Sequence, residues 1–231
     1  MVSRANLIFE NELEAVKSMI EILPNDKFKK ENSLIICSSL DSVFFADEIA
    51  KKLKIGYEIL FSESITAPNN SECTIACVGE TQEIVMIEEL VKSFGISLDY
   101  VYGQGNRKYE ENILKNIYKY RRGELLQSVA NKNILLVDDG CESGLTTLVC
   151  LKTLINLKAK TVSYITPLIP SSIVEKIKIL VDELFYVHNI ADFVSVDFYY
   201  KERLQTNRDC IMQILENSPY YLALQKIEGE K

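Results

Sequence analysis

One segment of the chain, residues 134–146 (ILLVDDGCESGLT), constrains the fold more than any other. Its first residues, Ile134 to Val137, are all apolar, as in a strand that is buried on both faces. Asp138 and Asp139 follow at once, and two glycines then permit a tight turn into a helix. The segment therefore predicts a parallel α/β sheet with a ligand site at the carboxyl end of this strand.

Apolar periodicity on both sides of this segment predicts further strands and helices in alternation. A short strand, a stretch of helical spacing and a second strand give a βαβ unit before residue 62, and the alternation resumes after residue 134. We predict strands at residues 34–37, 57–61, 134–137, 161–166 and 183–187, and helices at 42–53, 146–157 and 171–181. The expected architecture is a doubly wound, mainly parallel sheet with helices on both faces.

The stretch between residues 62 and 123 interrupts this alternation. The predicted elements there are a polar loop from residue 62, a hairpin of strands 74–78 and 83–86, a short helix at 87–94 and a polar helix within 106–120. An amphipathic helix ending near Pro24 and a last helix at 208–215 complete the prediction. The hairpin and the aromatic-rich segment 193–200 are candidates for a small hood over the carboxyl edge of the sheet.

Length and composition predict a single domain over residues 1–231. A chain of 231 residues, 47% of them hydrophobic, can bury one sizeable core, and we find no repeat or low-complexity linker. We expect the core at about residues 30–61 and 130–190 and the hood at about 62–95 and 191–205.

Charge and hydropathy indicate which partners and which cellular compartment to expect for this protein. The formal net charge is -7 and the lysines and arginines are scattered, so no basic face for nucleic acid is expected. Apolar runs stay well short of the roughly 18 residues that cross a bilayer, and residues 1–16 lack the pattern of a signal peptide. We therefore expect a cytoplasmic protein with reduced cysteines, no membrane contact and a small-molecule partner.

The residues after the 134–137 strand favour a phosphate. Ser143 and Thr146 place hydroxyls at the start of a helix, whose free N–H groups and positive dipole end face the turn. Asp138 and Asp139 beside this turn suit a ribose 5-phosphate, whose ring hydroxyls need acceptors. The alternative is that the acids cap a strand and the hydroxyls cap a helix. The order of strand, acid pair, Gly-x-x-Ser-Gly-x-Thr and helix is more restrictive than either feature alone, and it favours the phosphate site.

This segment resembles the phosphoribosyl-pyrophosphate (PRPP) signature of type I phosphoribosyltransferases. The resemblance implies that Asp138 and Asp139 are catalytic, hold the ribose hydroxyls, and contact Mg²⁺ through those hydroxyls or through water. It also implies a 5-phosphate cradle made of Cys141, Glu142, Ser143, Gly144, Leu145 and Thr146. Further segments resemble a subgroup of bacterial phosphoribosyltransferases of undefined substrate, namely residues 67–72, 86–97, 120–123 and 193–200.

The loop after the first predicted strand departs from the family. Relatives carry Arg-Gly-Gly or Lys-Gly there, and the backbone and cation of that loop hold pyrophosphate. This chain has Ser38, Ser39, Leu40 and Asp41 instead. Because the loop lacks both glycine and cation, and because Asp41 would repel pyrophosphate unless a metal intervenes, transfer chemistry is less secure than ribose-phosphate binding.

A second departure concerns Glu63 and Ser64, where the subgroup tends to have Arg-Lys. Catalysis of phosphoribosyl transfer requires positive charges that stabilise the leaving pyrophosphate. Mg²⁺ could supply part of that charge, and Lys108, Arg121 and Arg122 are candidate cations elsewhere in the chain.

Two further site predictions follow from the resemblance. The 6-oxopurine phosphoribosyltransferases carry an acid at the place of Glu142, so this side chain is a candidate general acid/base for a purine ring, with a solvated glutamate as the alternative. Phe193, Phe198 and Tyr199 are candidates for stacking on a nucleobase, with core packing or a dimer contact as the alternatives.

The leading functional hypothesis is an enzyme that moves a 5-phosphoribosyl group from PRPP to a nitrogenous base, with a purine as one candidate, and releases pyrophosphate. The alternative is a PRPP- or nucleotide-binding regulatory protein of the same fold with reduced or lost catalysis, which explains the missing cations more simply. The resemblance further implies Mg²⁺ as cofactor and a homodimer.

Overall fold

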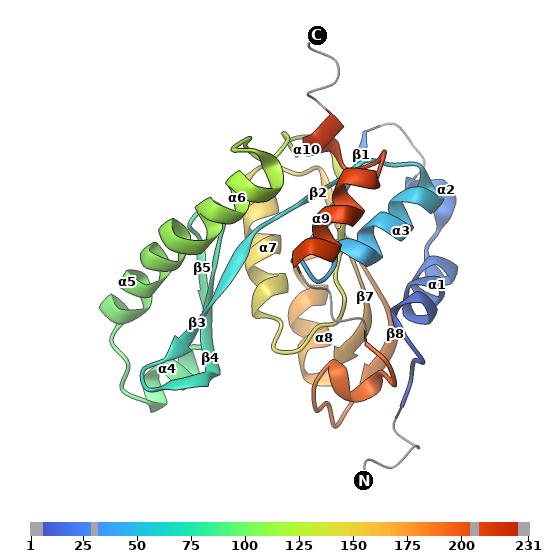
Figure 1. Cartoon of the computed structure of the whole chain (residues 1–231). Coiled ribbons are helices and arrows are strands. Elements are labelled where there is room, and N and C mark those ends of the chain that lie inside the picture. The colour runs from blue at the N-terminus through green and yellow to red at the C-terminus, as the bar shows by residue number, and fades with distance from the viewer. Residues whose placement is uncertain (1–6, 29–31, 204–207, 226–231) are drawn as a thin grey trace.

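The computed structural model describes residues 7–28, 32–203 and 208–225. Its centre is a five-stranded parallel sheet with the spatial order β2-β1-β6-β7-β8 (Figure 1). The strands are β1 (Ser33–Cys37), β2 (Tyr57–Ile59), β6 (Asn133–Val137), β7 (Thr161–Pro170) and β8 (Glu183–Ile190). The helices around the sheet are α1 (Glu12–Ile22), α2 (Asn25–Phe28), α3 (Val43–Leu53), α7 (Leu145–Asn156), α8 (Ser171–Lys178), α9 (Arg208–Asn217) and α10 (Leu222–Gln225). The predicted α/β class and the parallel sheet are confirmed.

Alternate residues of the central strands enter two apolar layers, because successive side chains of a strand point to opposite faces. Ile35 and Leu135 lie in a buried cluster with residues of α1 and α3. Their neighbours Ile36 and Leu136 lie in a second cluster with residues of α7 and α8. Helices therefore cover both faces of the sheet, as the continuous apolar runs of these strands require.

The strand register determines which polar residues meet at the carboxyl edge. Cys37 of β1 is paired with Val137 of β6, which is paired in turn with Ile165 of β7. Since β1 and β6 run in parallel and both end at this pair, the next residues, Ser38 and Asp138, emerge side by side. The backbone thereby brings together two segments that are 100 positions apart in the sequence.

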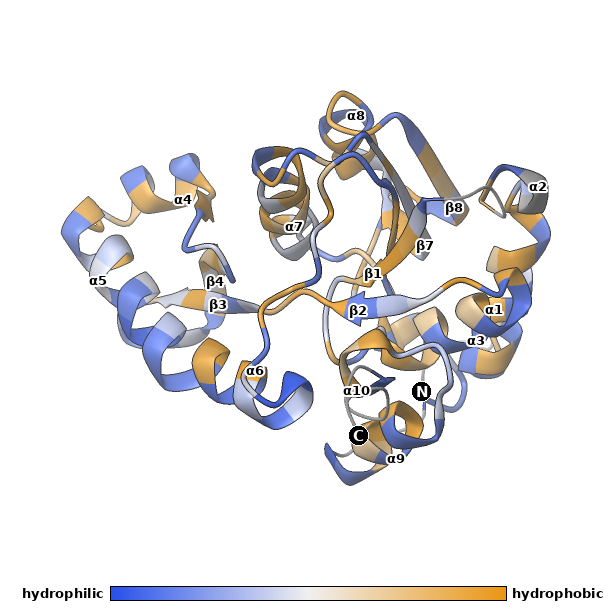
Figure 2. Ribbon diagram, turned by 90° about the horizontal axis from the view of Figure 1, so that it is seen from above, coloured by the Kyte–Doolittle hydropathy of each residue, from blue (hydrophilic) through white to orange (hydrophobic). Residues whose placement is uncertain are grey.

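A second, antiparallel sheet and a long helical segment lie beside the parallel sheet; these residues, 62–121, are called the hood below, whereas the predicted hood covered residues 62–95 and 191–205. Figure 2 shows these elements to one side of α7 and the parallel sheet to the other. They are β3 (Ser62–Ala67), β4 (Asn70–Gly79), β5 (Ile84–Met86), α4 (Glu88–Ser93), α5 (Leu98–Lys108), a π-helical turn (Tyr109–Ile113) and α6 (Leu114–Arg121). The predicted β4–β5 hairpin and helices are confirmed. The polar loop predicted from residue 62 is wrong, because β3 pairs with β4 although only Ile65 and Ala67 of its residues are buried.

The aromatic-rich segment packs against the amino-terminal stretch. The amide groups of Ile8 and Phe9 both donate to the carbonyl oxygen of Tyr199, at 2.9 and 3.0 Å, and Phe9 forms a bridge with Tyr200. Within the described residues, none of the helices combines the length and apolar character needed to cross a membrane. The single-domain organisation, with the core and hood bounds given above, stays a prediction.

Candidate functional site

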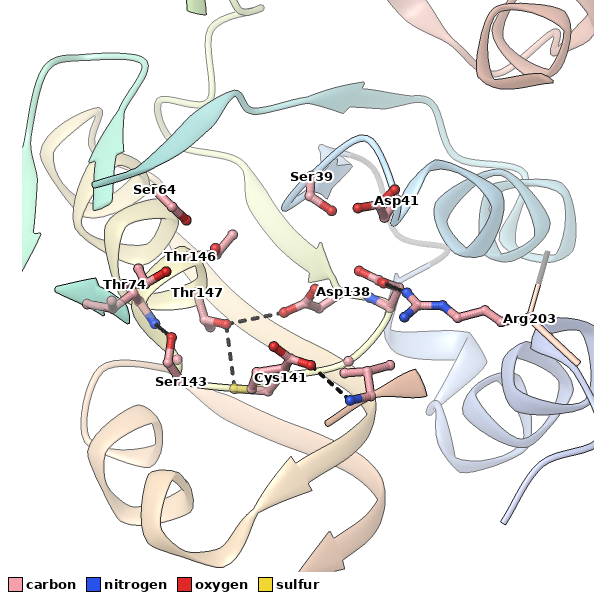
Figure 3. Close-up of a pocket in the computed structure, with 16 residues that line it drawn as sticks. Ser39, Asp41, Ser64, Thr74, Asp138, Cys141, Ser143, Thr146, Thr147 and Arg203 are labelled. Atoms are coloured by element: carbon pink, nitrogen blue, oxygen red, sulfur yellow. Dashed lines mark hydrogen bonds and ion pairs between the residues drawn. The ribbon is translucent and has the colours of Figure 1, made fainter. Parts of the chain in front are cut away.

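A cavity of about 320 Å³ opens where β1 and β6 end, bordered by the hood on one side and the aromatic-rich segment on the other. Figure 3 shows the side chains that line it. They are Ser39, Asp41, Ser64, Thr74, Asp138, Asp139, Gly140, Cys141, Glu142, Ser143, Gly144, Leu145, Thr146, Thr147, Val196 and Arg203. The cavity therefore unites the predicted acid pair and phosphate turn with parts of the loop after β1.

The phosphate turn, residues 140–146, depends on its two glycines. Gly140 and Gly144 have φ angles of 157° and 77°, which L side chains rarely adopt. A Cβ atom on Gly140 would meet Val196 at 2.5 Å, and one on Gly144 would meet Ile173 at 2.9 Å. The chain can therefore enter α7 directly at Leu145, and the first turn of that helix, whose N–H groups lack intrahelical partners, lines the cavity.

Cys141 contributes little to the cradle. Its N–H donates to the carbonyl oxygen of Leu168 at 2.9 Å, and its thiol contacts the hydroxyl of Thr147 at 3.9 Å. Burial, with the charge of Asp138 as the next cause, raises the pKa of this thiol to about 12, so it stays protonated at neutral pH. The polar side chains of the turn that line the cavity and suit a phosphate are the hydroxyls of Ser143 and Thr146.

The carboxylate of Asp138 is buried and fully hydrogen-bonded. It is 4% exposed, and both of its oxygens accept hydrogen bonds. The donors to Oδ1 are Ser38 Oγ at 2.9 Å and the Asp139 amide at 3.0 Å, and the donors to Oδ2 are Tyr164 OH at 2.7 Å and Thr147 Oγ1 at 3.2 Å. Asp138 therefore organises the floor of the cavity.

Asp139 lies nearer to the opening and has different partners. Its Oδ1 accepts from Ser42 Oγ at 3.0 Å, and its Oδ2 forms an ion pair with Arg203 Nη2. Burial and then the charge of Asp138 raise the pKa of this carboxyl from 3.8 to about 8, whereas Arg203 opposes the shift. The two acids of the pair thus have distinct environments, one saturated by neutral donors and one facing a cation.

Arg203 is a site residue that the sequence analysis missed. Its side chain is 28% exposed and also pairs with Asp197, and its Nε lies 3.8 Å from Glu12. Among the described residues that line the cavity it is the one cation, against four acids. Sequence reasoning could have noticed an arginine just after the aromatic-rich segment, but no local pattern indicates contact with a residue 64 positions away.

The predicted pyrophosphate loop is divided by the structure. Ser38 is fully buried and donates to Asp138, and Leu40 packs partly buried against the apolar core. Ser39 and Asp41 line the cavity, where Ser39 Oγ lies 2.9 Å from Ser42 Oγ. The hydroxyls of this region therefore serve the acid pair, and Asp41 is the one charged group that the loop turns to the cavity.

The other predicted residues lie at the margin of the cavity or outside it. Glu142 is exposed, and its Oε1 accepts from the Val196 amide at 2.9 Å, which ties the phosphate turn to the aromatic-rich segment. The rings of Phe193 and Phe198 pack on Tyr199, with centroids 5.4 and 5.2 Å apart, and none of the three lines the cavity. The structure thus places these rings in a packing cluster beside Val196.

Arg121, one of the cations considered for pyrophosphate, is fully buried in the hood. Its Nη2 pairs with Glu80, and its guanidinium lies 5.1 Å from the Phe61 ring centroid. Glu80 also accepts from the Phe61 amide at 3.3 Å. Arg121 therefore ties α6 to the start of the hood, and swinging it into the cavity would leave a buried carboxylate unpaired.

Comparison with known proteins places these features in a family. The family model described as "Phosphoribosyl transferase domain" matches residues 7–203. A Mycobacterium tuberculosis protein named "Putative phosphoribosyl transferase", found in two strains, is 24% identical over 174 residues. That alignment covers 75% of this chain and 39% of the relative, so the chain spans about two fifths of the relative's length.

A solved structure shows the same fold. The crystal structure of a protein from Thermus thermophilus superimposes with a TM-score of 0.72 and 21% sequence identity. The match covers 92% of this chain and 99% of the other. The Thermus thermophilus protein therefore shares the overall fold of this chain, including both the parallel sheet and the hood.

Proposed function

Because the chain belongs to the phosphoribosyl transferase domain family, we propose that it transfers a 5-phosphoribosyl group from PRPP to a nitrogenous base, with a purine as one candidate, and releases pyrophosphate. The observation that carries this proposal is the union of the phosphate turn and the acid pair in one cavity. A turn that binds a phosphate monoester and a carboxylate that accepts a ribose hydroxyl match the two ends of a ribose 5-phosphate.

Each group has a defined part in this proposal. The hydroxyls of Ser143 and Thr146 and the first N–H groups of α7 receive the 5-phosphate. Asp139 accepts a ribose hydroxyl, and Asp138 fixes the adjoining backbone through its bond from the Asp139 amide. Glu142 stands at the edge of the cavity with Oε1 bonded to Val196, so its position relative to an incoming base is set by the aromatic-rich segment.

The chemical step breaks the bond between C1 of the ribose and pyrophosphate and forms a bond from C1 to a nitrogen of the base. Negative charge grows on the pyrophosphate, and preorganised positive charge accelerates the step. Arg203 is the cation that the described cavity offers. Asp41, whose carboxylate lines the cavity, offers oxygen ligands of the kind that Mg²⁺ takes, and Mg²⁺ when bound would supply further charge to the leaving group.

The second candidate function is a regulatory protein that binds PRPP or a nucleotide with little or no turnover. This candidate is favoured by the contacts of Ser38 and Ser42, whose hydroxyls donate hydrogen bonds to the acid pair and are therefore not free to bind pyrophosphate. The neighbouring Asp41 faces the cavity. A site built in this way holds ribose phosphate but offers the leaving group little stabilisation.

Titration calorimetry with PRPP, with and without Mg²⁺, combined with a screen of bases for pyrophosphate release, tests both candidates. Binding followed by release with at least one base supports the transferase, and binding without release supports the regulatory protein. Failure to bind PRPP and ribose 5-phosphate overturns both. A cytoplasmic location and a homodimer stay predictions.

A further inference from the structure

Each carboxylate oxygen of the two acids in the cavity has at least one hydrogen-bond or ion-pair partner. Asp138 accepts hydrogen bonds on Oδ1 and Oδ2, and Asp139 accepts from Ser42 on Oδ1 and from Arg203 on Oδ2. A carboxylate has room for further donors, but Arg203, which also lines the cavity, occupies Oδ2 of Asp139. A ribose hydroxyl can therefore reach this acid best by replacing a donor of the protein.

The donors differ in how readily they can move. Ser38, Thr147 and Tyr164 are at most 1% exposed and belong to the ends or interior of core elements. Arg203 has a side chain that is 28% exposed, and it extends into the cavity from the segment after the short helical turn Asp197–Tyr199. Arg203 is thus the donor that an incoming ligand can displace without disturbing the sheet.

Other contacts would keep the arginine close after it leaves Asp139. Its Nη1 pairs with Asp197, whose side chain is 77% exposed, and its guanidinium lies 5.8 Å from the Tyr200 ring centroid. Displacement therefore exchanges one partner of Arg203 and preserves its contacts with Asp197, Tyr200 and Glu12. A ligand hydroxyl that takes the place of the guanidinium on Asp139 therefore does not leave Arg203 without partners.

We propose that Arg203 is a positioning residue for Asp139 that acts as a latch, holding the carboxylate until a ribose hydroxyl of the ligand displaces the guanidinium. The inference rests on the proposed function, because it assumes that ribose phosphate is the ligand of the cavity. The ion pair between Arg203 Nη2 and Asp139 Oδ2 occupies an oxygen that could otherwise accept the ribose hydroxyl. In the absence of ligand, Arg203 thus holds the carboxylate of Asp139 in place and keeps other hydrogen-bond donors from binding to Oδ2.

The test is the affinity for ribose 5-phosphate, a ligand without pyrophosphate, so that no leaving group attracts the guanidinium. Titration calorimetry at pH 9.5, above the pKa of about 8 of Asp139, compares the natural protein with Arg203→Gln. We expect the variant to bind about five-fold more tightly, because the ligand no longer competes with an ion pair. The matched control is Lys201→Gln, which removes the same charge from an exposed side chain that pairs with Glu10 at 2.7 Å. Its affinity should equal that of the natural protein.

The latch is overturned if Arg203→Gln leaves ribose 5-phosphate affinity unchanged or weaker, even where the natural protein binds the ligand and releases pyrophosphate. If the variant gains affinity but no base gives pyrophosphate release, the latch stands and the proposed transfer activity fails. Absence of ribose 5-phosphate binding in both proteins overturns the two proposals together.

Discussion

The hydroxyl of Ser38 donates to Oδ1 of Asp138 across 2.9 Å, deep in the protein. Ser38 belongs to the loop expected to hold pyrophosphate, and Asp138 belongs to the pair expected to hold ribose. Their contact follows from the register of β1 and β6, which end side by side at Cys37 and Val137. The serine therefore stabilises a buried carboxylate.

The first prediction concerns this buried bond. Ser38→Ala should lower the free energy of unfolding by about 1.5 to 3 kcal/mol, because it removes a hydrogen bond to a charged, buried group. Urea denaturation measures the loss. Ser39→Ala is the control, since Ser39 is only part-buried and does not donate to Asp138 among the described contacts. If the two substitutions lower the free energy of unfolding equally, the hydrogen bond from Ser38 to Asp138 does not contribute more to stability than the contacts of Ser39.

The second prediction concerns the close approach of Gly140 and Val196. Gly140→Ala should displace the aromatic-rich segment and weaken ribose 5-phosphate binding at least ten-fold, since its Cβ would meet Val196 at 2.5 Å at a φ of 157°. Calorimetry gives the affinity. Gly103→Ala is the control, because an added Cβ there meets nothing within 4 Å and the residue lies within α5. We expect that control to bind normally and to be stabilised by about 0.5 to 1 kcal/mol.

Local sequence patterns predicted those parts of the fold and site that depend on neighbouring residues. The strand ending at Val137 and the acids after it are where the sequence analysis placed them. Strand β3 was missed because most of its residues are polar and only Ile65 and Ala67 are buried. It forms a strand because it pairs with β4, and its composition does not indicate that pairing. The contacts of Arg203 with Asp139, and of Ser38 with Asp138, arise from chain segments 64 and 100 positions apart. Periodicity carries no information on such pairs.

The third prediction uses the raised pKa of Asp139. Between pH 4 and pH 8 the folded protein holds a proton on this carboxyl that the unfolded chain has released, so the carboxyl makes stability fall as the pH rises through this range. Asp139→Asn should therefore raise the free energy of unfolding at pH 8.5, by on the order of 1 to 3 kcal/mol, with the gain vanishing toward pH 4. Urea denaturation across the pH range measures it.

The same substitution should separate stability from function. At pH 9.5, where the carboxyl of Asp139 is ionised, Asp139→Asn should weaken ribose 5-phosphate binding by about 1.5 to 3 kcal/mol, because a charge-assisted acceptor becomes a neutral amide. If the Asp139→Asn variant is more stable but binds ribose 5-phosphate less tightly, the carboxyl of Asp139 serves ligand binding at the expense of stability. If the substitution destabilises the protein equally at pH 4 and pH 8.5, the carboxyl does not titrate as described.

The fourth prediction concerns Asp41, the exposed acid that the loop after β1 turns to the cavity. Asp41→Asn should tighten PRPP binding by about five-fold in low salt and by less in 0.5 M salt, because the repulsion of pyrophosphate by an exposed carboxylate is screened. Ribose 5-phosphate affinity should change much less, since that ligand carries no charge at C1. Glu110→Gln makes the same charge change at an exposed position outside the cavity lining and should affect neither ligand.

Asp41→Arg extends this prediction from binding to the chemical step. It leaves Ser38 and its bond to Asp138 in place, and it adds a cation next to the position of the leaving group. A preorganised charge there can lower the barrier by about 3 kcal/mol, which is about two orders of magnitude in rate. Pyrophosphate release per bound PRPP should therefore rise more than PRPP affinity does. If the natural protein already releases pyrophosphate at ordinary enzyme rates and Asp41→Arg slows it, then Asp41 assists catalysis, with Mg²⁺ as the group that it would hold.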